Sequence, residues 1–185
     1  MKLDLSELLA FVGRRHVLSI EEAPIVDEDL ECSAPIVGSL TFTNTGSVLL
    51  IKGEVETQVI QACSRCLTYF EEGVHVAIDE QFPLESRPGG PRGKMITSVV
   101  EEEDENPAVG RLFAGSLLDL TELLRQTISV ELPMQPLHAP DCKGLCPTCG
   151  VDRNQESCSC AATVAPSAFK GLAVLLERKS DSDAP

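Results

Sequence analysis

Five cysteines lie within the stretch DCKGLCPTCGVDRNQESCSC, from Asp141 to Cys160, and an earlier CSRC segment begins at Cys63. A Cys-x2-Cys turn presents two thiolates from one tight loop, which suits two corners of a tetrahedral zinc site. In the CPTCG segment that begins at Cys146, the proline fixes the start of the turn and the glycine is free to adopt a positive φ. The pattern constrains the fold, because sulfur atoms from remote parts of the chain must converge.

The chemistry of the eight cysteines depends on the compartment that holds the protein. The opening MKLDLSELLAFVGRRH has neither the charged start nor the long apolar run of a signal peptide, and no apolar window long enough to span a membrane is present. We therefore expect a cytoplasmic protein with no membrane contact, whose thiols stay reduced. Reduced thiols in such numbers favour metal binding or redox chemistry over disulfides.

Seven cysteines, with Cys32 set aside, and His138 supply eight candidate ligands, enough for two tetrahedral Zn2+ sites. The preferred partition has one site of Cys63, Cys66, His138 and Cys142 and a second of Cys146, Cys149, Cys158 and Cys160. The alternative is a single site of Cys63, Cys66, Cys146 and Cys149, built as two facing knuckles. Two sites are preferred because a single site leaves the neighbouring thiols of Cys158 and Cys160 exposed with no task. In plainer interpretations, Cys32 is a small buried hydrophobe and His138 only packs or caps.

Charge is unevenly placed along the chain, whose net charge is -14. Residues 1–133 hold 10 Lys+Arg and 23 Asp+Glu, whereas residues 134–185 hold 5 and 6. An acidic surface repels phosphate backbones, so any direct contact with RNA must be local and near the cysteine-rich end. The candidate RNA contacts are Arg65, Lys143, Arg153 and Lys170.

Hydrophobic periodicity predicts an α+β fold. Residues 35–83 alternate between apolar and polar side chains, which indicates an antiparallel β meander or a partly closed barrel. Within it, Leu49, Ile51, Val55, Val59 and Cys63 are expected on one face. Flanking helices are predicted over Asp4–Val12, from Ser116 to about Val130, and over Ser167–Lys179.

These elements suggest three segments. Residues 1–84 hold the first helix and the sheet, residues 85–109 form an acidic flexible loop, and residues 110–185 hold a helix, the cysteine cluster and the last helix. We expect residues 110–185 to pack with residues 1–84 as one unit.

Enzyme signatures are missing from the sequence. It has no His-Glu-x-x-His motif, no Ser-His-Asp arrangement and no phosphate-cradling glycine loop. The segment LTYFEEGVHV after Cys66 has the pattern of a strand, whereas a thioredoxin-like Cys-x-x-Cys opens a helix. We therefore expect a structural metal, no catalysis and no small-molecule substrate.

The ordered motifs ACSRCL, an acidic loop, LLDLTELLRQTISVELPMQPLH, the Asp141–Cys160 stretch and AFKGLAVLLERK together resemble the YceD family of bacteria and plastids. The resemblance extends from about Ser33 to Lys179. It implies a role in accumulation or processing of the 23S ribosomal RNA, with ribosomal precursor RNA or a large-subunit assembly protein as partner. It agrees with metal ligands at Cys63, Cys66 and the 142–160 cluster, and His138 stands where family members can have cysteine. No catalytic residue carries over.

Two classes of function follow. The first is a non-enzymatic, zinc-stabilised accessory factor in ribosome biogenesis. The second is a thiol redox or metal-responsive protein that uses its Cys-x-x-Cys and Cys-x-Cys pairs. A zinc-bearing interaction module with no ribosomal connection is a third possibility.

Overall fold

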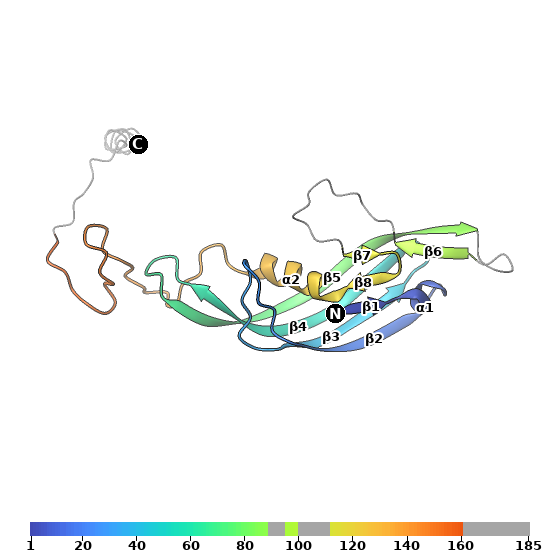
Figure 1. Cartoon of the computed structure of the whole chain (residues 1–185), viewed down its shortest axis with the longest axis horizontal. Coiled ribbons are helices and arrows are strands. Elements are labelled where there is room, and N and C mark those ends of the chain that lie inside the picture. Colours follow the sequence, from blue (N-terminus) through green and yellow to red (C-terminus); the bar gives the residue numbers. More distant parts are fainter. Residues whose placement is uncertain (89–94, 100–111, 161–185) are drawn as a thin grey trace, which may run out of the picture. The chain divides into compact units, whose positions relative to one another are not determined.

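The computed structural model describes residues 1–88, 95–99 and 112–160 (Figure 1). The chain divides into two compact units. We call Met1–Cys142 the sheet unit and Lys143–Pro185 the C-terminal unit.

A five-stranded antiparallel sheet is the largest element of the sheet unit. Its strands are β2 (Arg15–Glu22), β3 (Ile36–Asn44), β4 (Val48–Ala62), β5 (Tyr69–Pro88) and β6 (Met95–Val99), and strands adjacent in sequence are adjacent in the sheet. This is the predicted meander (Figure 1). Among the described residues β2 and β6 do not pair with each other, so the sheet is open and the barrel alternative is wrong.

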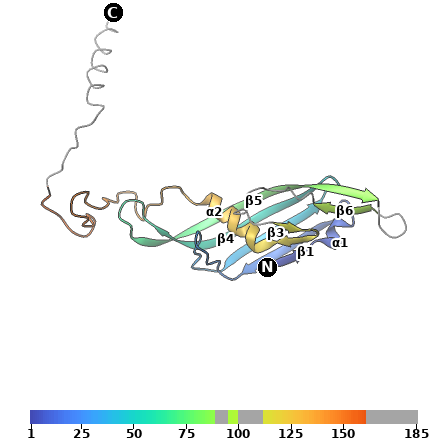
Figure 2. The ribbon, with the colours of Figure 1, turned by 45° about the horizontal axis from the view of Figure 1, so that its top comes forward.

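Smaller elements cover one face of this sheet. They are β1 (Lys2–Asp4), α1 (Ser6–Leu9), β7 (Phe113–Ala114), β8 (Leu117–Asp119) and α2 (Leu120–Glu131), with the three strands forming a sheet of order β1-β8-β7. Helix α2 packs on β5 and β1, and α1 packs on β3. Figure 2 shows α2 lying across the five-stranded sheet. The hydrophobic core lies between this layer and the sheet.

Alternation along β4 sets which side chains enter the core. The predicted inward residues Leu49, Ile51, Val55, Val59 and Cys63 are each 1% exposed or less. The intervening Lys52, Glu54 and Glu56 are exposed. Burial of each large aliphatic side chain contributes about 1.5–3 kcal/mol, so this face of β4 accounts for much of the stability of the sheet unit.

Glycine at position 53 permits a close approach between β3 and β4. A Cβ there would lie 2.0 Å from the carbonyl oxygen of Ser39, which is backbone and cannot swing away. Any other residue at position 53 would push the two strands apart.

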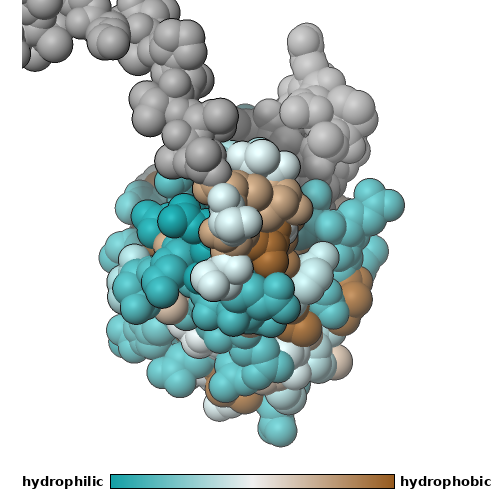
Figure 3. All heavy atoms as spheres, turned by 90° about the vertical axis from the view of Figure 1, so that its left-hand side faces the viewer, coloured by the Kyte–Doolittle hydropathy of each residue, from teal (hydrophilic) through white to brown (hydrophobic). Residues whose placement is uncertain are grey.

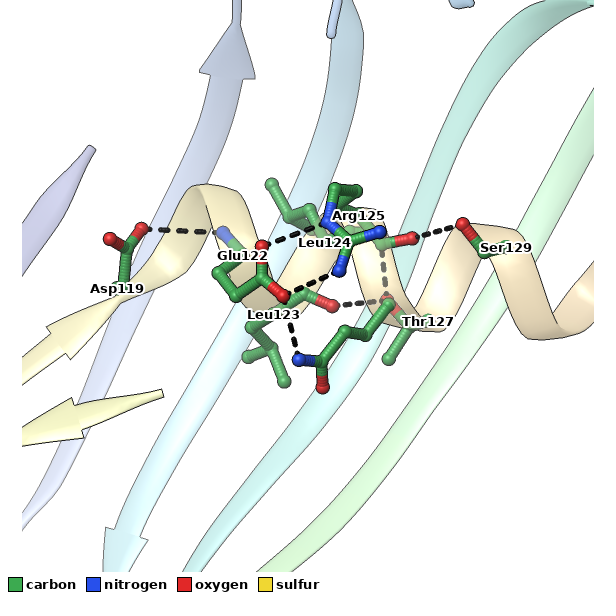
Figure 4. Close-up of polar contacts among 8 residues, drawn as sticks. Asp119, Glu122, Leu123, Leu124, Arg125, Thr127 and Ser129 are labelled. Atoms are coloured by element: carbon green, nitrogen blue, oxygen red, sulfur yellow. Dashed lines mark hydrogen bonds and ion pairs between the residues drawn. The ribbon is translucent and has the colours of Figure 1, made fainter. Parts of the chain in front are cut away.

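Helix α2 begins after Asp119, whose side chain caps the N-terminus of the helix (Figure 4). The Asp119 carboxylate accepts the Glu122 amide at 3.3 Å. Arg125 donates to both oxygens of Glu122, at 2.8 and 2.6 Å, and its hydrogen bonds lower the pKa of that carboxyl group. The opposite face buries Leu120, Leu123, Leu124 and Ile128 in the core.

Both predicted helices of the sheet unit are longer than the observed ones. The first covers Ser6–Leu9 rather than Asp4–Val12, because Asp4 pairs with β8 and the chain turns after Leu9; Val12 is 70% exposed. The second begins at Leu120 rather than Ser116, because residues 117–119 pair with β1. Strand β2 was not predicted.

The loop predicted over residues 85–109 is partly strand. Residues 84–88 pair with Met95–Val99 as an antiparallel hairpin, so this part of the loop prediction is wrong. Residues 89–94, the acidic run of residues 101–105 and the helix predicted over residues 167–179 lie outside the described residues. Residues 112–142 belong to the sheet unit, and packing of residues 143–185 with it stays a prediction. No described helix is long and apolar enough to cross a membrane.

Candidate metal centres

Two groups of side chains in the described chain could each hold a metal ion. The sheet-unit group consists of Cys63, Cys66, His138 and Cys142, and the C-terminal group of Cys146, Cys149, Cys158 and Cys160. Within each group the four ligand atoms lie within 4.8 Å of one another. All eight cysteines are free thiols. The structure thus brings together the same residues as the preferred sequence partition.

The first knuckle is the tip of the β4–β5 hairpin. The ladder ends at the pair Ala62–Tyr69, and beyond it the Cys63 amide donates to the Thr68 carbonyl at 2.9 Å. The Leu67 amide then donates to the Cys63 carbonyl at 2.9 Å. Leu67 has a φ of 63°, a left-handed conformation unusual for a residue with a side chain. The tight turn thereby directs the Cys63 and Cys66 sulfurs to one side.

The second knuckle repeats this geometry at the same sequence offsets. The Cys146 amide donates to the Val151 carbonyl at 2.8 Å, and the Gly150 amide donates to the Cys146 carbonyl at 2.9 Å. Gly150 has a φ of 75°, which glycine adopts without strain. An isolated bridge between Leu145 and Asp152 occupies the place of the Ala62–Tyr69 pair.

The segment that closes the sheet-unit group is attached to the first knuckle by its backbone. The Ser64 amide donates to the Pro136 carbonyl at 2.9 Å, and the Arg65 guanidinium donates to the Cys142 carbonyl at 3.0 Å. The Cys66 sulfur lies 3.3 Å from His138 Nδ1, and the Cys63 and Cys142 sulfurs are 3.8 Å apart. The three cysteines of this group are buried and His138 is exposed.

A turn centred on Asp152 closes the C-terminal group. Its carboxylate accepts the Asn154 amide at 2.9 Å and Gln155 Nε2 at 3.1 Å. The Asn154 side chain in turn accepts the Lys143 amide at 2.8 Å. Of the four ligands only Cys146 is buried. This group is therefore held by short-range polar contacts with little apolar burial.

Hydrogen bonding divides the thiols into acidic and weakly acidic members. Burial raises the pKa of Cys63, but hydrogen bonds from the His138 ring and from nearby backbone amides outweigh it and lower the pKa to about 5. Backbone amides of Cys149 and Thr148 lower the pKa of Cys146 to about 6. The hydrogen bond between Cys158 and Cys146 raises the pKa of Cys158. The hydrogen bond between Cys160 and Cys149 raises the pKa of Cys160 to about 12.

These pKa shifts indicate which kind of ion the two groups of ligands can bind. Four thiolates within 4.8 Å repel one another, so some keep their protons unless a cation lies between them. A divalent cation removes the repulsion and lets all the sulfurs ionise. Structural zinc sites are formed by three cysteines with one histidine or by four cysteines, and the residues present fit that ion.

The remaining predicted residues fall outside the two groups. Cys32 is buried in the hydrophobic core, where burial raises the pKa of its thiol, in agreement with the interpretation as a small apolar residue. Arg65 lies between ligands, and Lys143 and Arg153 are exposed in the C-terminal unit. Lys170 lies outside the described residues. Contact of these cations with RNA stays a prediction.

A hollow of about 600 Å³ is lined by three cysteines of the C-terminal group, Cys146, Cys158 and Cys160, and also by Lys143 and Arg153. Hydrophilic residues predominate on the face seen in Figure 3, with hydrophobic residues between them.

The sequence did not reveal the supporting roles of two residues, Leu67 and Arg65. Leu67 gave no signal, because leucine is not a residue associated with positive φ. Arg65 drew attention by its place between two cysteines, but its carbonyl partner at Cys142 is 77 residues away. Only the tertiary structure reveals that Arg65 joins the two halves of the sheet-unit group.

Comparison with known proteins gives the family. The model of the family described as large ribosomal RNA subunit accumulation protein YceD matches residues 51–176. An uncharacterized protein of Mycobacterium tuberculosis is 30% identical over 141 residues, which cover 76% of this chain and 58% of that protein. A Mycobacterium leprae protein is 31% identical over 65% of this chain and 50% of its own length.

A plant relative carries a descriptive name. The Zea mays protein named large ribosomal RNA subunit accumulation protein YCED homolog 1, chloroplastic, is 24% identical over 68% of this chain and 48% of its own length. The chain thus spans between about half and three fifths of the length of the relatives it matches. No solved structure matches it. With its family match over residues 51–176 and both candidate metal groups inside that range, the chain belongs to the YceD family of large ribosomal RNA subunit accumulation proteins.

Proposed function

We propose that this protein is a non-enzymatic accessory factor in large-subunit ribosome biogenesis, and that each of its two cysteine-rich groups holds one structural zinc ion. The observation that carries the proposal is the coincidence of family membership with two ligand groups, each drawn together inside one unit. The family name links relatives to accumulation of large-subunit ribosomal RNA.

Zinc in the sheet-unit group would act as a crosslink. It would join the β4–β5 tip to Cys142 and so close a loop of about 80 residues, which restricts the unfolded chain. Zinc in the C-terminal group would instead hold a short segment in one conformation. Neither role needs an open coordination position, because all four ligands come from the protein.

The proposed partner is ribosomal precursor RNA or a large-subunit assembly protein, met in the cytoplasm. The net charge of -14 makes RNA contact over the whole surface unfavourable. If RNA is bound directly, Lys143 and Arg153 beside the hollow and Arg65 at the first knuckle are the cations to test, with Lys170 as the fourth sequence candidate. An assembly protein with a basic surface would instead meet the acidic sheet unit.

Removal of the protein from cells tests the ribosomal role. We expect immature 23S ribosomal RNA to accumulate, mature large subunits to decrease, and the protein to sediment with precursor particles. Complementation with Cys149→Ser should fail, while Cys32→Ala, which changes a core cysteine outside both groups to another small apolar residue, should restore growth and rRNA processing. Normal rRNA processing in cells lacking the protein would contradict the proposal.

Pull-down from extract with and without nuclease distinguishes the two partners. Loss of the association after nuclease treatment indicates RNA, and its persistence indicates a protein. If RNA is the partner, Lys143→Ala together with Arg153→Ala should weaken the association and reduce its salt dependence.

The acidic thiols support a second candidate function, a redox or metal-responsive protein. The pKa of Cys63 is lowered to about 5 and that of Cys146 to about 6, and the thiolate is the reactive form of cysteine. This candidate predicts reversible zinc release on mild oxidation, with a disulfide within one group. Zinc that stays bound under mild oxidant, together with no disulfide exchange, would exclude it.

A further inference from the structure

Strand β2 is a long edge of the five-stranded sheet. Its eight residues pair with β3 in one unbroken register, from Arg15 opposite Thr43 to Glu22 opposite Ile36. On its other side no described strand pairs with it (Figure 1). Edge strands are usually protected by charged side chains, proline, bulges or short length; β2 has no proline or bulge, and it carries charged side chains only at its ends, Arg15, Glu21 and Glu22.

The side chains of β2 are ordered by charge. Arg15 lies at one end and Glu21 near the other, both on the face that turns away from the core, because Thr43 and Val37 are their cross-strand neighbours on that face. Within the described chain neither side chain forms an ion pair. Between them, Val17 is 60% exposed and Leu18 is half-buried. On the solvent face Val17 and Ser19 therefore lie between opposite charges, and Leu18 lies at the centre of the strand on the core face.

This order is self-complementary for an antiparallel partner. A twofold axis perpendicular to the sheet through Leu18 places Arg15 of one copy opposite Glu21 of the other, and repeats the pair on the far side of the axis. Directly opposite residues of an antiparallel pair share a face, and positions 15 and 21 have the same parity, so both charge pairs form on the solvent face. Leu18 meets its own copy on the core face.

We propose that β2 pairs with β2 of a second copy of this chain, in this register, and that the two five-stranded sheets join into one continuous sheet. The backbone of the edge supplies the hydrogen bonds, and the two Arg15–Glu21 pairs fix the register. A shift of the axis by one residue would set Val17 opposite Glu21 and leave Arg15 without an acidic neighbour. This self-association is independent of the proposed ribosomal role.

Sedimentation of the full-length, metal-loaded protein over a wide concentration range at low ionic strength tests the proposal. We expect a reversible monomer–dimer equilibrium. Arg15→Glu sets two acidic pairs face to face and should weaken dimerisation at least about tenfold, and Glu21→Arg should do the same with basic pairs. The double variant Arg15→Glu with Glu21→Arg restores opposite charges in the same register and should recover the dimer.

A matched control separates this effect from net charge. Glu56→Arg makes the same change of charge as Glu21→Arg on the same face of the sheet, but on the interior strand β4, and should leave dimerisation unchanged. A protein that stays monomeric at all concentrations overturns the proposal. So does a dimer that both single variants leave intact, or one that the double variant fails to restore.

Discussion

The two knuckles share one local geometry but differ in what supports them. In both, the first cysteine amide bonds to the carbonyl five residues on, and the residue after the second cysteine has a positive φ. The first knuckle ends the β4–β5 ladder, which runs from Val48–Pro83 to Ala62–Tyr69, whereas a single bridge, Leu145–Asp152, precedes the second. The turn itself therefore needs only a few residues. We expect the structure around each turn to determine how far the folding of that turn depends on a bound metal.

The ligands of the two metal groups also differ in how far they are buried. Three ligands of the sheet-unit group are buried, against one in the C-terminal group. The hydrophobic core includes Val55, Val59, Val74 and Val76 of the β4–β5 hairpin, so we expect the hairpin to stay folded without a metal. The C-terminal group has few apolar contacts to replace the ion, so metal binding and local folding should be one event there.

Metal removal should give the largest difference between the two regions. On addition of a strong chelator, we expect amide protons of residues 143–160 to lose their protection from hydrogen exchange, while β3, β4 and β5 keep theirs. The apparent binding free energy of structural zinc, roughly 10–16 kcal/mol, is folding free energy where no structure exists without it. Equal loss of protection in both regions would show that both depend on the metal to the same extent.

Single ligand substitutions should separate the two centres. Cys149→Ser should release one zinc and unfold its surroundings, while Cys66→Ser should release one zinc and loosen only the hairpin tip and residues 136–142. Each variant should keep the other ion, because the groups lie in different units. Zinc content and the number of dispersed NMR amide signals check both outcomes. Loss of both ions from either variant would show that the centres are coupled.

A reciprocal exchange at the positive-φ position tests the shared turn geometry. Gly150→Leu should lower zinc affinity about tenfold, because a leucine there is strained by about 1–2 kcal/mol and a Cβ meets no neighbour that could compensate. Leu67→Gly should raise the stability of the first knuckle by up to about 1 kcal/mol, because Leu67 is 62% exposed and loses little packing. Competition titration with a zinc-binding dye measures the first, and thermal unfolding the second. A loss of affinity in both variants would contradict the assigned geometry.

A smaller effect is expected where stability does not involve metal. Glu122→Gln removes the ion pair with Arg125 and should lower the free energy of unfolding of the sheet unit by about 0.5–1 kcal/mol at neutral pH. The pKa of Glu122 is lowered in the folded state by its hydrogen bond from Arg125, so this stabilisation is complete above about pH 4.3 and is lost as the pH falls through the lowered pKa.

Comparison of the denaturant midpoints of the two proteins at pH 7 and below about pH 4 checks this. The exposed Glu71→Gln should show neither effect. A change in zinc content in Glu122→Gln would show that the helix affects metal binding, contrary to the expectation that α2 is stabilised without the metal.

Much of the sheet and of the ligand partition could be predicted from local pattern. Period-two alternation placed Leu49 to Cys63 on one face because β4 is solvated on the other face, and Cys-x2-Cys spacing is itself a property of the turn. Strand β2 was missed because its polar ends, Arg15-His16 and Glu21-Glu22, obscure the alternation. The hairpin of β5 and β6 was missed because the prolines and glycines between them resemble a loop.

The support for the centres could not be predicted, because it is tertiary. The bond between Arg65 and the Cys142 carbonyl joins positions 77 residues apart, and the positive φ of Leu67 follows from closure of the turn rather than from its residue type. The start of α2 shifted for a similar reason, since the pairing of Leu117 with β1 overrides its helical spacing.

Metal content of the protein purified without added metal tests the central claim most directly. Mass spectrometry under native conditions should find two zinc ions per chain, and one each in Cys66→Ser and Cys149→Ser. A single zinc in the unaltered protein, no zinc, or a disulfide within either group would contradict the claim that two separate ligand groups each hold an ion.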